Sequence, residues 1–132
     1  YLVIMYIART EYMKNDISGF MKGKCMKTQL KKGVIELLVL ALLTQKDQYG
    51  YEIVETISRY IEMSEGSIYP LLKRLQKEEF VDTYWKESTS GPPRNYYKIT
   101  EGGKRTYVEM LRQWKEFSTA VNRFLKGINE KD

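Results

Sequence analysis

The sequence predicts a mainly α-helical fold that carries one two-stranded β-hairpin and ends in a long helix. Three observations support this fold class. Apolar residues recur at helical spacing in three short segments between residues 30 and 79. The pattern then changes to alternation in two runs, 81–85 and 95–99, with a turn-rich loop between them. Beyond Thr100 the apolar residues return to helical spacing.

The composition is that of a folded protein, and it excludes several kinds of chemistry. Apolar residues make up 42% of the 132 residues, which favours a buried core over disorder. The absence of histidine excludes His-based acid–base catalysis, Ser-His and Cys-His nucleophile pairs and the usual zinc sites. The single cysteine, Cys25, can form a disulfide only with another chain. We therefore predict a protein that is not an enzyme and that needs no cofactor or metal ion.

No segment of the sequence predicts membrane insertion or secretion. The longest apolar stretch, Val34–Leu43, contains Glu36 and falls well short of the ~20 residues of a membrane-spanning helix. The apolar residues 1–8 have no basic segment before them, which makes a poor signal peptide. A lone cysteine suits a reducing compartment. We expect a cytoplasmic protein with no membrane partner.

The order of the predicted elements is that of a winged helix-turn-helix. The first helix, of about 12 residues, has its apolar positions at Val34, Leu37, Leu38, Ala41 and Leu42. Asp47–Gly50 is predicted to be a turn, and a second short helix ends near Tyr60. Ser64 is placed to cap a third helix, which runs to about Glu79. In this fold the third helix enters the major groove of DNA, and the hairpin, or wing, contacts the duplex beside it.

The third helix and the wing together have the chemistry of a DNA-contacting surface. When Ile68, Leu71, Leu72 and Leu75 face inward, the opposite side presents cations and hydroxyls, and no acid lies between Gly66 and Lys77. A turn rich in Gly and Pro places Arg94 at a rigid wing tip. A solvated helix face and a hairpin with a solubilising charge are the alternative interpretations, but two adjacent basic elements favour DNA. The predicted contact residues are Ser67, Tyr69, Lys73, Arg74, Lys77 and Arg94.

The charge distribution limits this argument. Residues 1–32 carry seven Lys or Arg and two Asp or Glu, and residues 33–132 carry 15 of each sign. The net charge of +5 therefore belongs to the N-terminal segment, and the body of the chain is neutral. A protein–protein adaptor that uses the same fold without DNA is the alternative that this neutrality leaves open.

The last helix carries an apolar stripe for which so small a domain has no obvious internal partner. Six steps along the stripe cover 21 residues, a mean spacing of 3.5, which is the period of a helix packed along another helix. The stripe consists of Tyr107, Leu111, Trp114, Phe117, Val121, Phe124 and Ile128. A second copy of the chain is the partner that this stripe predicts.

Three motifs resemble those of the PadR family of bacterial regulators, over about residues 26–128. Residues 26–43 followed by YGYEI (49–53) are similar to the opening of that family, and EGSIYPLLKRL (65–75) resembles its recognition helix. GPPRNYYKITEGG (91–103) resembles its wing and the start of its last helix. The resemblance implies a homodimeric winged-helix repressor, often of detoxification or efflux genes, that a small molecule releases. Carried over by position, it implies major-groove contacts from Ser67, Tyr69, Lys73 and Arg74 and a wing contact from Arg94.

A single C-terminal helix resembles the short subfamily, some members of which bind flat aromatic drugs between paired tryptophans at the dimer centre. Trp114 occupies the matching position. Two interpretations stay open for it, a dimer-core residue and a platform for an aromatic effector. Leu111, Phe117 and Val121 accompany it in both interpretations.

These observations predict a ligand-responsive transcriptional repressor that binds double-stranded DNA, at an inverted-repeat operator, as a homodimer. We expect a winged helix-turn-helix domain over residues 26–100 and a dimerisation helix over 101–130. Residues 1–25, which short members of the family usually lack, form an N-terminal extension with two interpretations. One is a tail or sequence upstream of the native start, and the other is an arm on the dimer or on the DNA backbone.

Overall fold

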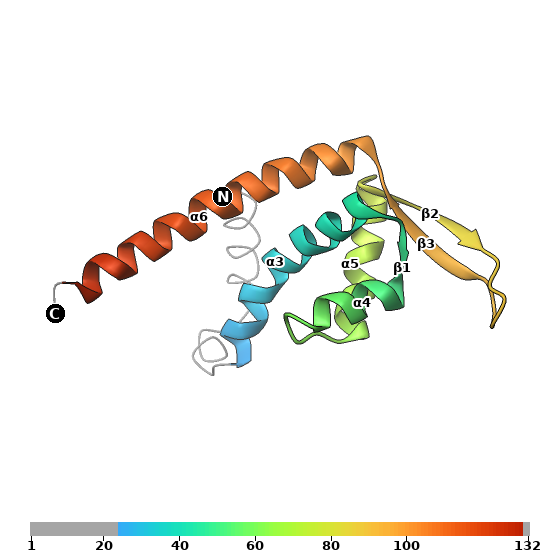
Figure 1. The fold of residues 1–132 in the computed structure, drawn as a ribbon, viewed down its shortest axis with the longest axis horizontal. Helices are drawn as coiled ribbons and strands as arrows, with labels where there is room; N and C mark the ends of the chain where they lie inside the picture. The colour runs from blue at the N-terminus through green and yellow to red at the C-terminus, as the bar shows by residue number, and fades with distance from the viewer. Residues whose placement is uncertain (1–23, 131–132) are drawn as a thin grey trace. The chain divides into compact units, whose positions relative to one another are not determined.

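The computed structural model describes residues 24–130, with side chains from residue 33 onward. Most of the predicted N-terminal extension therefore lies outside the described residues. The elements are α3 (Lys24–Gln45), β1 (Gln48–Tyr49), α4 (Gly50–Ser58), α5 (Glu65–Lys77), β2 (Val81–Lys86), β3 (Arg94–Ile99) and α6 (Glu101–Asn129), as Figure 1 shows. The described residues fall into two compact units, residues 36–107 and residues 24–35 together with 108–130.

The predicted fold class is confirmed, with one correction to the sheet. Residues 48–49, expected within a turn, form the short strand β1, so the sheet has three antiparallel strands in the order β1-β3-β2. Gln48 pairs with Tyr97 and Tyr49 with Tyr96. Two residues are too few to show alternation, and their partner strand lies far along the chain, so the sequence pattern carries no sign of this strand.

The core of the 36–107 unit gathers around α5. Ile68, Leu72 and Leu75 are fully buried, as predicted, and only Leu71 is less buried than expected. Besides these three residues, the core contains Leu37, Val39, Leu40, Leu43, Ile53, Ile57, Val81, Tyr97 and Ile99. None of the described helices is long and apolar enough to cross a membrane.

The helix α3 has 22 residues and is longer than predicted, and of its predicted apolar positions only Leu37 is buried. The helix begins at Lys24. The polar residues before position 33 are compatible with a helix but show no apolar period, so the sequence pattern does not reveal this start. Val34, Leu38, Ala41 and Leu42 are only half-buried, whereas Ile35, Val39, Leu40 and Leu43 are buried. A helix that is apolar on nearly all sides does not reveal from its sequence which side is covered.

A tight corner joins α5 to the wing. The amide of Glu79 donates to the carbonyl of Gln76, and the amide of Phe80 donates to that of Leu75. This pair of bonds is the Schellman arrangement, which satisfies the last carbonyls of a helix and requires a left-handed residue between helix and strand. Glu79 is that residue, with φ 62°, and it is the one non-glycine residue with positive φ in the described part of the chain.

The start of α6 is attached to the same corner. Thr100 is the predicted cap of this helix, and its Oγ1 accepts a bond from the amide of Gly103 at 3.0 Å and donates to the carbonyl of Glu79 at 2.7 Å. The amide of Thr100 donates to the carbonyl of Phe80. Gly103 lies so close to this backbone that an added Cβ would be 2.1 Å from the Phe80 oxygen. Only glycine fits there.

Replacing Gly103 by alanine should therefore lower the free energy of unfolding by about 2 kcal/mol, because the Cβ meets rigid backbone instead of a flexible side chain. The neighbouring change Gly102→Ala is the matched control. A Cβ on Gly102 would meet nothing closer than 3.7 Å, and alanine should favour the helix by about 0.5 kcal/mol. Urea unfolding of both variants measures the difference. Equal stabilities would contradict the close approach described here.

Candidate nucleic-acid interface

The exposed face of α5 is set by its buried one. Because Ile68, Leu72 and Leu75 face the core at spacings of four and three residues, Lys73 and Lys77 are turned toward solvent. The helix begins after Ser64, as predicted, but the Ser64 hydroxyl pairs with the Ser67 hydroxyl at 3.1 Å instead of capping a helix amide. Of the predicted contact residues on α5, all are exposed; they are Ser67, Tyr69, Lys73, Arg74 and Lys77.

Arg74 differs from the two lysines, because it is already engaged within the protein. Its Nη2 lies 3.0 Å from Oε2 of Glu36, on α3. The side chain of Arg74 is 47% exposed, whereas that of Glu36 is only 8% exposed. The pair therefore ties one edge of α5 to α3. Sequence reasoning identified the arginine and missed this partner.

Glu36 is a buried carboxylate whose partner the sequence analysis did not identify. It interrupts an apolar stretch, and a carboxylate buried in such a helix requires a partner, so the signal was present without indicating which cation would meet it. Burial raises the pKa of Glu36 above its ordinary value, while Arg74 acts to lower it. Desolvation is the larger effect, so the ion pair compensates only part of the burial cost.

Tyr69 is held by a glycine on the neighbouring helix. A Cβ added to Gly50, the first residue of α4, would lie 2.7 Å from Cε1 of Tyr69 and 2.9 Å from its hydroxyl oxygen. The ring therefore lies directly against the backbone at the start of α4 and still remains 43% exposed. The pKa of Tyr97 is raised by burial and, to a smaller extent, by the phenol of Tyr69. Two motifs of the sequence, YGYEI and EGSIYPLLKRL, thus meet through this contact.

The two faces of the wing, residues 81–99, differ in chemistry. Neighbouring strands align Tyr49, Tyr96 and Tyr84 in one row, and we call this side the tyrosine face. The ring centroids of Tyr49 and Tyr84 each lie 5.6 Å from that of Tyr96. The Tyr84 hydroxyl donates to Asp47 at 2.8 Å, which raises the pKa of that phenol. The other side, which we call the α5 face, includes Thr83, which accepts a hydrogen bond from Gln76 of α5.

The wing cations lie on the tyrosine face. Arg94 is the first residue of β3 and does not lie in the loop 87–93. The prediction that it lies at the tip of the wing was therefore wrong. Its guanidinium carbon is 4.6 Å from the centroid of the Tyr49 ring, and Nζ of Lys86 is 5.4 Å from that of Tyr96. Both side chains are exposed, and both rest on aromatic rings.

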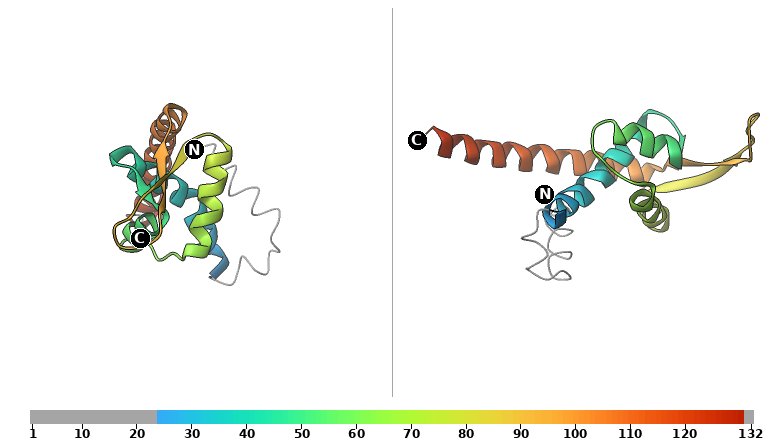
Figure 2. Two further views of the ribbon diagram at one scale, coloured as in Figure 1. Left: turned by 90° about the vertical axis from the view of Figure 1, so that its right-hand side faces the viewer. Right: turned by 90° about the horizontal axis from the view of Figure 1, so that it is seen from below.

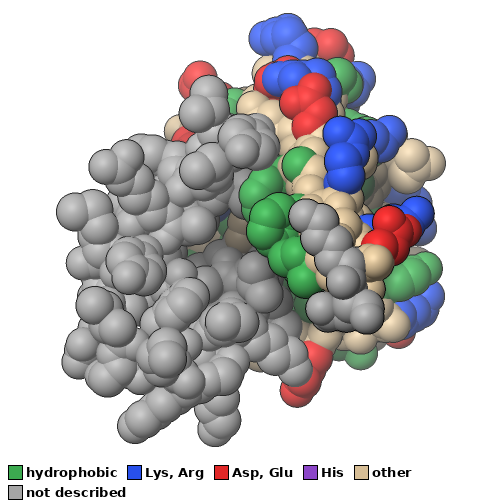
Figure 3. Space-filling model, turned by 90° about the vertical axis from the view of Figure 1, so that its left-hand side faces the viewer, with side chains coloured by type: hydrophobic (Ala, Val, Ile, Leu, Met, Phe, Trp, Pro, Cys, Tyr) green, Lys and Arg blue, Asp and Glu red, His purple; other side chains and the backbone are tan. Residues whose placement is uncertain are grey.

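The predicted stripe on α6 divides into two parts. Leu111, Trp114 and Phe117 are half-buried, whereas Val121 is 38% exposed and Phe124 is 69% exposed. Leu125 and Ile128 are also exposed. Figure 3 shows hydrophobic side chains gathered together on the face seen from the C-terminal end. Exposed apolar residues at spacings of three and four form one face of the helix.

An amphipathic helix with a cationic outer face, followed by a β-hairpin and preceded by two helices, defines the class of winged helix-turn-helix proteins. Comparisons with known proteins agree with this class. Residues 39–109 match the model of the transcriptional regulator PadR-like family. A protein of Lysinibacillus sphaericus without an assigned function is 30% identical over 107 residues, which cover 78% of this chain and 98% of the relative.

Solved structures agree as well. A PadR-like transcriptional regulator from Bacillus cereus is 41% identical, with a TM-score of 0.68, over 74% of this chain and 96% of that chain. A PadR family regulator from Clostridium difficile is 32% identical, with a TM-score of 0.65, over 69% and 97% of the two chains. The chain belongs to the PadR-like family of transcriptional regulators. It is therefore a DNA-binding regulator and not an enzyme, as predicted.

The ion pair between Arg74 and Glu36 predicts a pH-dependent stability. The variant Arg74→Met keeps the alkyl chain but leaves Glu36 buried without its cation. It should lose about 2 kcal/mol of unfolding free energy at neutral pH, a moderate value because Arg74 is half exposed. The pKa of Glu36 in the folded state is raised above 4.5, its ordinary value. The contribution of protonated Glu36 to the free energy of unfolding is therefore complete below pH 4.5 and is lost as the pH rises through the folded-state pKa. Without Arg74 the pKa rises further, so the loss extends to higher pH.

Urea unfolding at several pH values measures this effect, and two further variants control for it. Lys73→Met changes a neighbouring exposed cation in the same way and should leave the pH profile unchanged. Adding Glu36→Gln to Arg74→Met removes the unpaired charge and should restore most of the stability. A pH profile for Arg74→Met that parallels the wild type would contradict the assignment.

Proposed function

We propose that this chain is a cytoplasmic repressor that binds an inverted-repeat operator as a homodimer and is released by a small aromatic molecule. The observation that carries the proposal is the exposed face of α5, where Lys73 and Lys77 lie with Ser67 and Tyr69 on one side of a helix. We retain the division into a DNA-binding domain, residues 26–100, and a dimerisation helix, residues 101–130. On a two-fold axis, two such helices would read half-sites about 34 Å apart.

We assign the six predicted contact residues to four roles. Lys73 and Lys77 are the phosphate contacts, because both are exposed cations on α5. Ser67 and Tyr69, nearer the start of the helix, supply hydroxyls for base edges. Arg94 contacts the duplex from the wing once it leaves Tyr49, and Arg74 acts by holding α5 in place.

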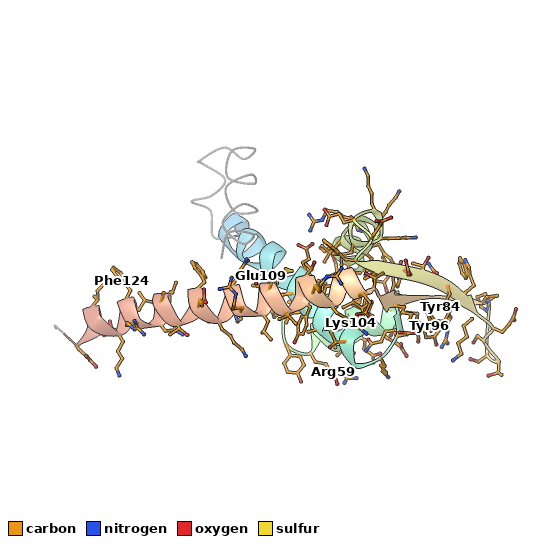
Figure 4. All side chains as sticks on the ribbon, turned by 90° about the horizontal axis from the view of Figure 1, so that it is seen from above. Arg59, Tyr84, Tyr96, Lys104, Glu109 and Phe124 are labelled. Carbon is orange, nitrogen blue, oxygen red and sulfur yellow. The ribbon has the colours of Figure 1, made fainter. Side chains whose placement is uncertain are left out.

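The variant Lys73→Ala should weaken DNA binding and should reduce the slope of log affinity against log salt by about 1, because one phosphate contact is lost. Arg59→Ala is the matched control. Arg59 is an exposed cation paired with Glu55 on α4, and Figure 4 shows it on the side of its unit away from α5. Fluorescence anisotropy of a labelled duplex at several salt concentrations measures both variants. An unchanged slope for Lys73→Ala would remove Lys73 from the interface.

The homodimer is supported by the apolar face of Val121, Phe124, Leu125 and Ile128, which is exposed on a single chain. Pairing this face with the same face of a second copy would remove it from water. Phe124→Glu should therefore shift the protein toward monomer in sedimentation equilibrium. Thr119→Glu, on the opposite side of the helix, should leave the dimer intact. A monomeric wild type at micromolar concentration would overturn the proposal.

The effector part of the proposal rests on Trp114, which is half-buried and shares the predicted stripe of α6 with Leu111, Phe117 and Val121. An indole at the centre of a dimer offers a flat surface for an aromatic ring. Planar aromatic cations should quench the emission of Trp114 and release a labelled duplex over the same concentration range, because the ligand must favour one dimer geometry. Trp114→Ala should abolish both responses. Compounds that release DNA equally from wild type and Trp114→Ala would place the effector elsewhere.

A further inference from the structure

The wing exposes a tryptophan that the assignments above leave without a role. Trp85, on β2, is 72% exposed, although tryptophan gains more from burial than most side chains. It is placed opposite Asn95 on β3, next to the loop 87–93. Packing in the protein core therefore does not explain why a tryptophan occupies this position. It is therefore available to a partner.

The sheet geometry fixes the side of the wing to which Trp85 belongs. Successive residues of a strand point to opposite faces, so Trp85 shares the face of Thr83 and not that of Tyr84. Thr83 is hydrogen-bonded to Gln76 of α5, at 3.3 Å. Figure 4 labels Tyr84 and Tyr96 on the opposite side, toward α4, and Figure 2 likewise shows α5 and α4 on different sides of the wing. Trp85 therefore lies on the α5 face.

The α5 face of the wing is aromatic and uncharged, whereas the helix beside it is cationic. Lys86 and Arg94 belong to the tyrosine face, where each lies over a ring. On the α5 side, the exposed cations of the helix are Lys73, Lys77 and Arg74, and Arg74 is paired with Glu36. A duplex attracted to the lysines of α5 would also reach the α5 face of the wing, because Gln76 of α5 is hydrogen-bonded to Thr83, two residues before Trp85. An anionic polymer with apolar sugar surfaces complements both features, which is the reason for choosing DNA as the occupant.

We propose that Trp85 is a DNA-contact residue, with its indole packed against the deoxyribose edge of the groove beside α5. The inference rests on the proposed function and adds an apolar contact to its polar ones. Such a contact neutralises no phosphate, so it strengthens binding without steepening the salt dependence. It differs in this respect from the contacts of Lys73 and Lys77.

The test compares two neighbouring aromatic residues on opposite faces of one strand. The probe is a labelled duplex selected by the wild-type protein from a random-sequence pool. Trp85→Ala should weaken binding about tenfold with an unchanged salt slope, and Trp85→Phe should retain most of the affinity. Tyr84→Ala, on the tyrosine face, should bind nearly as well as wild type. Since Trp85 is largely exposed, thermal unfolding of Trp85→Ala should match that of wild type.

Intrinsic fluorescence supplies a second readout. Binding of the unlabelled duplex should change the tryptophan emission of the wild type, and this change should be lost in Trp85→Phe. If Trp85→Ala binds as tightly as wild type, or if Tyr84→Ala loses as much affinity, the inference is overturned while the proposed function stands. In a Trp114→Phe background, where Trp85 is the single tryptophan, an emission change that follows protein concentration without DNA would assign Trp85 to a contact between chains and overturn it too. A wild type that selects no duplex from the pool would refute the proposed function itself.

Discussion

The burial of one edge of α5 determines how this molecule can meet DNA. Ile68, Leu72 and Leu75 are fully inaccessible to solvent, so the helix cannot rotate about its axis without exposing them. Burying three such side chains is worth several kcal/mol at about 1.5–3 kcal/mol each. This is more than any one polar contact on the other side of the helix provides. The orientation of Lys73 and Lys77 is therefore a consequence of the core.

Two further contacts refine that orientation. The pair of Arg74 with Glu36 limits sliding of α5 along α3, and the ring of Tyr69 against Gly50 limits its approach to α4. Both contacts use residues of the predicted DNA-contacting face, so part of that face serves the protein itself. A substitution at Arg74 or Tyr69 that weakens DNA binding must therefore be separated from an effect on packing.

The sequence predicted those parts of the molecule in which neighbours along the chain determine the outcome. The apolar spacing of α5 and the alternation of β2 and β3 are local patterns, and the structure has both. Contacts between distant segments were not predictable in the same way. The strand β1 is recognisable only through its pairing with β3, and the partner of Glu36 lies 38 positions further along, at Arg74. The position of Arg94 over Tyr49 likewise depends on the assembled sheet.

The left-handed residue at the end of α5 has a consequence for how this protein could be improved. A side chain with a Cβ in that conformation costs about 1 kcal/mol, and glycine avoids most of the cost. Replacing Glu79, with φ 62°, by glycine would therefore stabilise the folded protein. The backbone of Glu79 turns between α5 and β2, and this residue is not one of the proposed DNA-contact residues. Engineering for a hotter environment could begin at this corner and leave the choice of operator untouched.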